Sequence, residues 1–151
     1  MKKVGLVGGI GPESTISYYH DIVYGVQKEV GRDFFPDVSI ESIALFKWVD
    51  LCDKKEYDKL ADYTMEPIER LARSGADFAV LTANTAHLIF DQVHSRSPIP
   101  LISIVEAAAE EAARRGYAKV GLLGIGFTMK NDFFNPPFQK RGIEVAIPGE
   151  E

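Results

Sequence analysis

Cysteine is almost missing from this chain of 151 residues, because Cys52 is its only thiol. One cysteine excludes a disulfide within the chain and a cysteine-rich zinc site. Long apolar runs are missing as well, since stretches such as 78–81 fall far short of the roughly 20 residues that cross a membrane. Met-Lys-Lys leads directly into a strand pattern rather than a secretory leader. We therefore expect a cytoplasmic protein with no membrane partner.

An excess of basic residues is also lacking. Lysine and arginine number 17 against 22 aspartate and glutamate residues, which gives a net charge of -5. Because the chain has no basic stripe to attract a polyanion, we expect no nucleic acid partner. The length and an apolar content of 46% are sufficient for the hydrophobic core of an ordinary domain.

Strand and helix patterns alternate along the chain. Short apolar or alternating segments predict strands at residues 3–8, 38–43, 78–81, 101–104, 119–124 and 143–147. Residues 46–52 are expected to form a loop, and Pro67 is expected to kink or break a helix at 57–73. The alternating order predicts an α/β fold with a parallel sheet flanked by helices.

The first predicted strand ends in a glycine-rich segment, Gly8-Gly9-Ile10-Gly11-Pro12. Glycines allow a sharp turn and a close approach of the backbone to a ligand, and Pro12 suits the first turn of a helix. The spacing fits neither the GxGxxG fingerprint nor a P-loop, which would need a lysine here. Two interpretations stay open, namely an anion-binding loop and a tight strand-to-helix turn.

A second strand-to-helix turn follows the uncharged strand 78–81. It has the sequence Thr82-Ala83-Asn84-Thr85-Ala86-His87. Asn84 is expected to cap the helix that begins there. Ligands of parallel α/β sheets bind at the carboxyl ends of the strands, where unpaired N–H groups converge. We therefore predict that this turn forms half of an active site.

Part of the sequence is repeated. Residues 119–124 differ from residues 3–8 at one position, and a glycine-containing loop follows both. A duplicated α/β unit explains the match, although six residues of a buried strand can also agree by chance. Duplication predicts a first domain at 1–104 and the beginning of a second at 105–151. We expect either a fragment of a longer protein or a homodimer that covers an exposed sheet.

Four segments, in this order, resemble the aspartate/glutamate racemase family. They are Gly8 to Thr15, Ala83 to His87, Pro100 to Glu106, and Gly121 to Gly124 together with Phe127 to Met129. The resemblance runs the whole length of the chain. It implies an amino-acid racemase built from two similar α/β domains, which needs no pyridoxal phosphate and no other cofactor.

In such racemases two acid/base residues, usually cysteines, lie on opposite sides of the substrate, one from each domain. One removes the Cα proton and the other supplies a proton to the opposite face. The resemblance implies that Asn84 and Thr85 hold the α-amino and carboxylate groups of a small amino acid or dicarboxylate. It also implies that Gly9 and Ile10 contact this substrate through the backbone. Thr128 matches a threonine of the second domain.

The chain departs from the family at the first catalytic position. Ala83 replaces the cysteine that precedes the Asn-Thr pair, and a methyl group can neither accept nor donate a proton. The second catalytic cysteine would lie beyond Glu151. We therefore expect the chain to be inactive or impaired as a racemase. The alternative is a non-catalytic module that binds an amino acid or a dicarboxylate.

Other polar residues are weaker candidates, and none is assigned to a metal. Thr82 could replace the missing base, but it lies one residue early and neighbouring strand side chains face opposite ways. His87 could act as an acid or base, although packing or capping is the commoner role. Lys47 could pair with a side-chain carboxylate. Cys52 falls near a substrate-contacting position, yet a buried apolar role is favoured.

Overall fold

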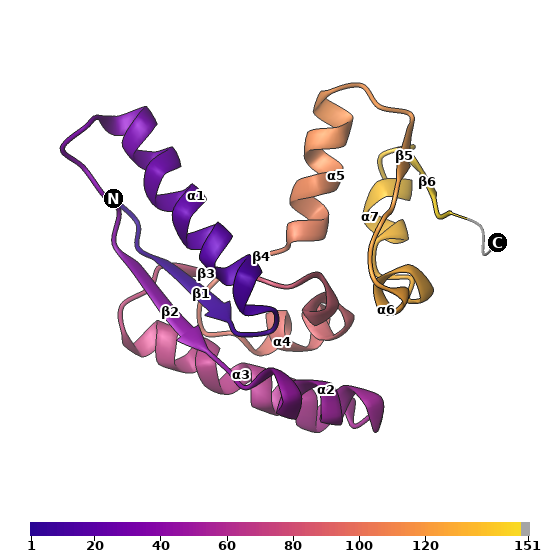
Figure 1. The fold of residues 1–151 in the computed structure, drawn as a ribbon, viewed down its shortest axis with the longest axis horizontal. Helices are drawn as coiled ribbons and strands as arrows, with labels where there is room; N and C mark the ends of the chain where they lie inside the picture. Colours follow the sequence, from indigo (N-terminus) through magenta and orange to yellow (C-terminus); the bar gives the residue numbers. More distant parts are fainter. Residues whose placement is uncertain (149–151) are drawn as a thin grey trace. The chain divides into compact units, whose positions relative to one another are not determined.

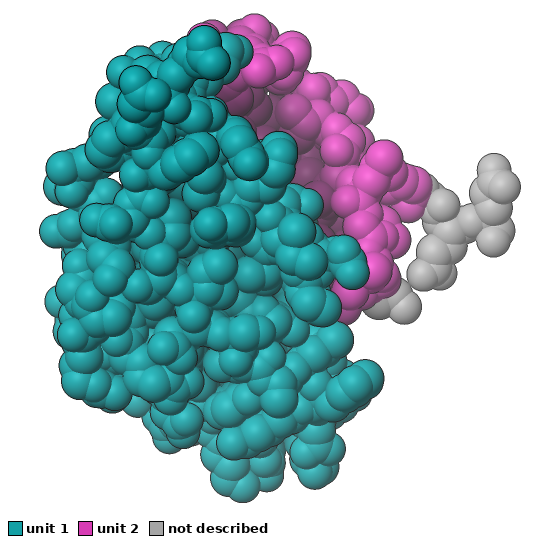
Figure 2. All heavy atoms as spheres, turned by 60° about the vertical axis from the view of Figure 1, so that its left-hand side comes forward, with its two compact units in different colours: residues 1–102 teal, residues 103–151 magenta. Residues whose placement is uncertain are grey.

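The computed structural model describes residues 1–148, apart from the side chain of Lys130. The chain divides into two compact units, residues 1–102 and residues 103 onward (Figure 2). The first unit contains a four-stranded sheet and the second a two-stranded one. Within the described residues, no helix has the length and apolar character needed to span a membrane.

Unit 1 alternates strands and helices. Its elements are β1 (Val4–Gly8), α1 (Pro12–Val30), β2 (Val38–Ser42), α2 (Leu45–Asp53), α3 (Tyr57–Arg73), β3 (Phe78–Leu81), the 3-10 helix η1 (Asn84–Ile89), α4 (Phe90–Arg96) and β4 (Leu101–Ile102) (Figure 1). The strands are all parallel, in the order β2-β1-β3-β4. The predicted α/β class, a parallel sheet flanked by helices, is confirmed.

Helices α1 and α3 cover opposite faces of β1. A Cβ atom added at Gly5 would lie 3.1 Å from Leu71 of α3, whereas one at Gly8 would lie 2.4 Å from Thr15 of α1. This alternation is what the two-residue period of a strand requires. Strand β1, an inner strand of the sheet, is therefore covered on both sides, and all its residues are buried.

Helix α3 runs unbroken through Pro67, so the predicted kink or break is wrong. Proline removes one backbone donor from a helix, which weakens it locally. Here the apolar face of α3, which includes Leu60, Ile68 and Leu71, is almost completely buried. Because most helix stability in proteins comes from packing such a face, the burial outweighs the missing hydrogen bond.

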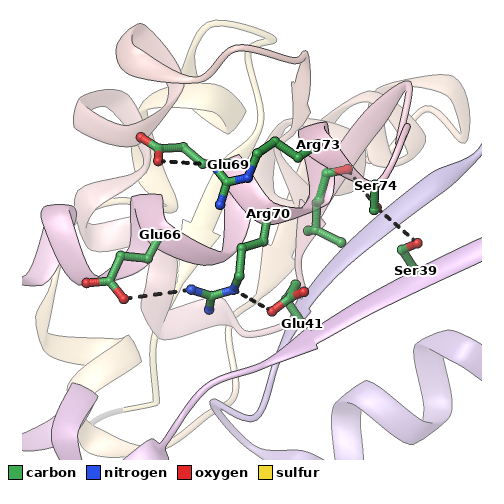
Figure 3. A network of polar contacts seen from close by, with 8 residues as sticks. Ser39, Glu41, Glu66, Glu69, Arg70, Arg73 and Ser74 are labelled. Atoms are coloured by element: carbon green, nitrogen blue, oxygen red, sulfur yellow. Dashed lines mark hydrogen bonds and ion pairs between the residues drawn. The ribbon is translucent and has the colours of Figure 1, made fainter.

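Polar contacts at the surface join α3 to β2 (Figure 3). Arg70 Nε donates to Glu41 Oε2 across 2.7 Å, and Arg70 Nη1 lies 3.8 Å from Glu66 Oε2. Just beyond the helix, Ser74 Oγ donates to Ser39 Oγ at 3.2 Å. Because these side chains are partly exposed, each ion pair contributes about 1 kcal/mol or less. The pairs therefore supplement the apolar packing beneath them.

Residues 45–53 form helix α2, so the prediction of a loop at 46–52 is wrong. Trp48 and Cys52 lie one turn apart on its buried face, and they are 3% and 6% exposed. Apolar residues spaced i, i+4 are a helical signal. A helix of nine residues offers only this one clear pair, which explains why the sequence pattern did not reveal it.

Unit 2 is built around the short parallel sheet of β5 (Lys119–Gly121) and β6 (Glu144–Ala146). Its helices are α5 (Ile104–Arg114), α6 (Gly126–Lys130) and α7 (Asn135–Gln139). A small core gathers Val105, Ala109, Ala112, Phe138 and Ile143. Leu123, which the internal repeat matches to Val7, is 78% exposed, whereas Val7 is 1% exposed. The repeated segment is thus buried in unit 1 and partly bare in unit 2.

The close packing of the glycine loop in unit 1 can be tested at Gly9. Gly9 has a φ angle of 87°, and a Cβ atom there would lie 2.2 Å from the carbonyl oxygen of Ile43. We predict that Gly9→Ala lowers the free energy of unfolding by about 2–4 kcal/mol. Gly25→Ala in α1 is the control, because nothing lies within 4 Å of the added Cβ. It should stabilise the helix by roughly 0.5–1 kcal/mol. Urea unfolding followed by circular dichroism measures both variants, and equal stabilities would contradict the strain assigned to Gly9.

Candidate ligand-binding site

The carboxyl ends of β1 and β3 lie side by side in unit 1. The two strands are parallel neighbours, and their register pairs Val7 with Leu81. Gly9 and Ile10 follow β1, and residues 83–85 follow β3. The structure therefore brings the residues predicted in these two turns to one edge of the sheet, where ligands of parallel α/β sheets bind.

The glycine loop after β1 is fixed by contacts on its inner side. Gly9 is buried, and its N–H donates to Thr15 Oγ1 at 3.1 Å. The N–H of Ile10 has no hydrogen-bond acceptor in the described part of the chain. Of the two amides that the resemblance places against a ligand, the Gly9 amide is therefore already bonded, whereas the amide of Ile10, a residue 6% exposed, is not.

Two buried hydroxyl groups connect this loop to β1 and β3. Thr82 Oγ1 donates to the carbonyl oxygen of Val7 at 3.1 Å, and it lies 3.0 Å from Thr15 Oγ1. Because a hydroxyl group has one hydrogen, the bond from Thr82 to Val7 leaves Thr15 as the donor to Thr82, at a shorter distance than its other acceptor, the carbonyl oxygen of Gly11 at 3.4 Å. The Thr82 side chain is 1% exposed and its hydrogen is committed to Val7. Burial therefore favours a structural role for Thr82 over that of a base, which would have to reach the substrate.

Ser14 makes a second connection between α1 and β3. Its Oγ lies 2.7 Å from the carbonyl oxygen of Gly11 and 2.7 Å from that of Thr82. Ser14 and Thr15 were not among the residues predicted for the site. The available signal was a pair of adjacent hydroxyl residues in the first helical turn after a glycine loop, a place where such side chains often bond to the backbone.

The turn after β3 leaves a polar side chain open to solvent. Ala83 has extended backbone angles, φ -144° and ψ 134°, and it is the residue that precedes η1. The expectation that Asn84 caps this helix is wrong, because Asn84 is the first residue of η1 itself. Its side chain is exposed and has no hydrogen-bond partner among residues 1–148. Thr85 beside it is half-buried.

His87 is packed into the body of unit 1. It is 6% exposed, and its ring is stacked on Phe90 with centroids 5.0 Å apart. Its Nδ1 lies 3.2 Å from the carbonyl oxygen of Ala83, so this nitrogen carries the hydrogen of the neutral ring. Burial lowers the pKa of His87, and hydrogen bonds to the backbone offset only part of that effect. The ring is therefore neutral at physiological pH.

The remaining predicted residues belong to other elements. Cys52 is buried in α2, where burial and the nearby Asp53 carboxylate raise the pKa of its thiol, which disfavours the reactive thiolate. Thr128 is a buried residue of α6 in unit 2. Lys47 Nζ lies 4.0 Å from the ring centroid of Tyr63, as in a cation–π contact. No group of three or more His, Cys, Asp or Glu side chains among the described residues is placed to hold a metal ion.

The pattern of a known family extends over nearly the whole chain. A family model described as Asp/Glu/Hydantoin racemase matches residues 7–151. This chain belongs to that family. The resemblance carried by the glycine loop and the Asn-Thr turn is thereby confirmed.

Individual relatives agree with this assignment. The broad specificity amino-acid racemase RacX of Bacillus subtilis (strain 168) is 24% identical over 145 residues, which cover 94% of this chain and 63% of that protein. The structure of an aspartate racemase homologue from Pyrococcus horikoshii OT3 has a TM-score of 0.87 at 34% identity, and the match covers 99% of this chain and 66% of that one.

A third relative shares the fold alone. The aspartate racemase of Picrophilus torridus has a TM-score of 0.81 at 19% identity, with 98% of this chain and 63% of that chain covered. The chain thus spans about two thirds of the length of the relatives that it matches.

The buried histidine makes stability depend on pH in a defined direction. Because the pKa of His87 is lower in the folded protein than its ordinary value of 6.5, the unfolded chain binds more protons as the pH falls below 6.5. We predict that wild-type protein loses more stability between pH 7.5 and about pH 5 than His87→Gln does. Urea unfolding at both pH values measures the difference.

His20→Gln is the matched control for this measurement, because His20 is exposed on α1. This variant should keep the acid sensitivity of the wild type. If His87→Gln and His20→Gln lose equal stability in acid, the conclusion that buried His87 is neutral is wrong.

Proposed function

We propose that this chain is the substrate-binding part of an amino-acid racemase of the aspartate/glutamate type, which moves the Cα proton without pyridoxal phosphate. Membership of the family supports the racemase relationship. The observation that carries the proposal is the carboxyl edge of the unit 1 sheet. There the free amide of Ile10 and the exposed side chain of Asn84 follow two adjacent parallel strands.

Each of these groups suits one part of an amino acid. The Ile10 amide can donate to a carboxylate oxygen, and the Asn84 amide can both donate to a carboxylate and accept from an ammonium group. Thr85 adds a hydroxyl group at the same turn. A second carboxylate, as in aspartate or glutamate, needs a cation, and Lys47 in the first turn of α2 supplies one.

Proton transfer is where the chain falls short of this function. Inversion at Cα needs an acid/base group on each side of the substrate, and Ala83 stands where one is expected. Its neighbours are poor replacements, because the Thr82 and His87 side chains are buried, at 1% and 6% exposed, and have little access to a substrate. We therefore propose that the chain by itself is inactive or impaired as a racemase.

Ala83 also favours a second candidate function. A chain that keeps the carboxylate-binding groups but lacks a proton-transfer group would act as a binding module for an amino acid or dicarboxylate. The two candidates share the same ligand-binding edge and differ only in chemistry. Binding without exchange of the Cα hydrogen therefore distinguishes the module from the racemase.

We further propose that two copies of the chain associate through unit 2. Leu123 and Ile125 are 78% and 65% exposed, although the repeat matches Leu123 to the buried Val7. Pairing with a second copy would remove this apolar surface from water. Light scattering of the purified chain should give a dimer mass that Leu123→Glu reduces, and a monomer at every concentration would contradict the proposal.

A thiol placed at residue 83 tests the assignment of that position. We predict that Ala83→Cys accelerates exchange of the Cα hydrogen of one enantiomer of aspartate or glutamate in D2O by tenfold or more, because general base catalysis typically contributes roughly 100-fold or more. Proton NMR of the amino acid follows the exchange. Calorimetry on the same samples measures binding.

Ala72→Cys is the control, since it places a thiol on α3 outside the predicted site. Equal exchange rates for Ala83→Cys and Ala72→Cys would contradict the assignment of residue 83 to the proton-transfer position. Saturable binding by the wild type without exchange on either enantiomer would favour the binding module.

A further inference from the structure

The proposed site is made of two separate segments, so its geometry depends on what holds them together. One segment is the glycine loop after β1, and the other is the turn at 83–85 after β3. We infer that the hydroxyl groups of Thr15 and Thr82 form the device that positions these segments relative to each other. This inference rests on the proposed function, and it assigns positioning residues that do not touch the substrate.

Thr82 anchors the end of β3 in three ways. Its N–H donates to the carbonyl oxygen of Val7 at 3.0 Å, and its hydroxyl group donates to the same oxygen at 3.1 Å. Its own carbonyl oxygen lies 2.7 Å from Ser14 Oγ, whose single hydrogen the carbonyl oxygen of Gly11 can also accept at 2.7 Å. Because Thr82 directly precedes Ala83, these bonds determine where the ligand-binding turn starts.

Thr15 connects that anchor to the glycine loop. Its Oγ1 accepts from the Gly9 N–H at 3.1 Å and donates to Thr82 Oγ1 at 3.0 Å. The hydrogen bonds thus run in one direction, from Gly9 through Thr15 and Thr82 to Val7. The carbonyl oxygen of Gly11, 3.4 Å from Thr15 Oγ1, is a second acceptor for the same hydrogen, and the shorter separation of 3.0 Å favours Thr82.

The close approach of Thr15 depends on a glycine. A Cβ atom at Gly8 would lie 2.4 Å from Thr15 Cγ2 and 2.7 Å from its Oγ1. Only a residue without a side chain at this position lets the helix place a hydroxyl group directly over β1. Thr15 and Thr82 are 8% and 1% exposed, so water has little access to replace the bonds if one hydroxyl group is removed.

Two substitutions of Thr15 separate the effect of its hydroxyl group from the effect of its volume. Thr15→Val keeps the branched shape but leaves the Gly9 N–H and an acceptor site on Thr82 unpaired. Thr15→Ser keeps the hydroxyl group and loses a methyl group. Thr64→Val is the matched control, because Thr64 is a fully buried threonine whose hydroxyl group donates to Leu60 within α3.

The experiment measures two quantities on the wild type and these three variants. Hydrogen exchange of the Gly9 amide, followed by NMR, reports whether the loop is held. Calorimetry with aspartate and with glutamate reports ligand affinity. We expect Thr15→Val to speed Gly9 exchange and weaken binding roughly tenfold, as expected for the loss of a buried hydrogen bond. Thr15→Ser should behave as the wild type, and Thr64→Val should lower stability without changing either quantity.

Two results would overturn the inference. One is Gly9 exchange in Thr15→Val that equals the exchange in Thr15→Ser. The other is a loss of affinity in Thr64→Val as large as that in Thr15→Val, which would mean that affinity follows general stability. If the wild type binds neither amino acid, the proposed function fails, and Gly9 exchange alone still decides whether Thr15 holds the loop.

Discussion

A line of hydrogen bonds through two buried threonines is the constraint on which the site depends. It begins at the Gly9 amide, passes through Thr15 and Thr82, and ends at the carbonyl oxygen of Val7. The parallel sheet brings the ends of β1 and β3 together, but strand pairing stops at those ends. The two threonine hydroxyl groups hold the turns in place beyond the last paired residues of the strands. A ligand at this edge would therefore meet donors whose positions are set before it binds, which reduces the entropy lost on binding.

The arrangement separates ligand binding from chemistry. The groups proposed to bind an amino acid are the backbone of the glycine loop and the polar side chains of residues 84 and 85, which strand geometry and the threonine bonds place. Proton transfer on this side of the substrate would depend on the side chain at residue 83. A change to alanine there removes the acid/base group without disturbing the extended backbone that leads into η1. Loss of activity and retention of binding are therefore compatible in one fold.

The sequence was sufficient to predict those parts of the structure that depend on local pattern. Strands β1 and β3, the glycine turn and the Asn-Thr turn each have a short signal of apolar runs followed by small or polar residues. The sequence was insufficient where contacts between residues far apart in the chain determine the structure. Thr15 and Thr82 are 67 residues apart, so no periodicity connects them, and the sequence favoured a structural role for Thr82 over that of a base without showing its partner. Pro67 continues through α3 because tertiary burial outweighs local preference.

The central claim is that the carboxyl edge of the unit 1 sheet binds an amino acid. A titration of 15N-labelled protein with aspartate, followed by amide NMR, tests this most directly because it reports binding residue by residue and requires no turnover. The account predicts saturable shifts at Ile10, Asn84 and Thr85, with residues of α3 unaffected. Shifts confined to other parts of the chain, or no shift at saturating aspartate and glutamate, would contradict it.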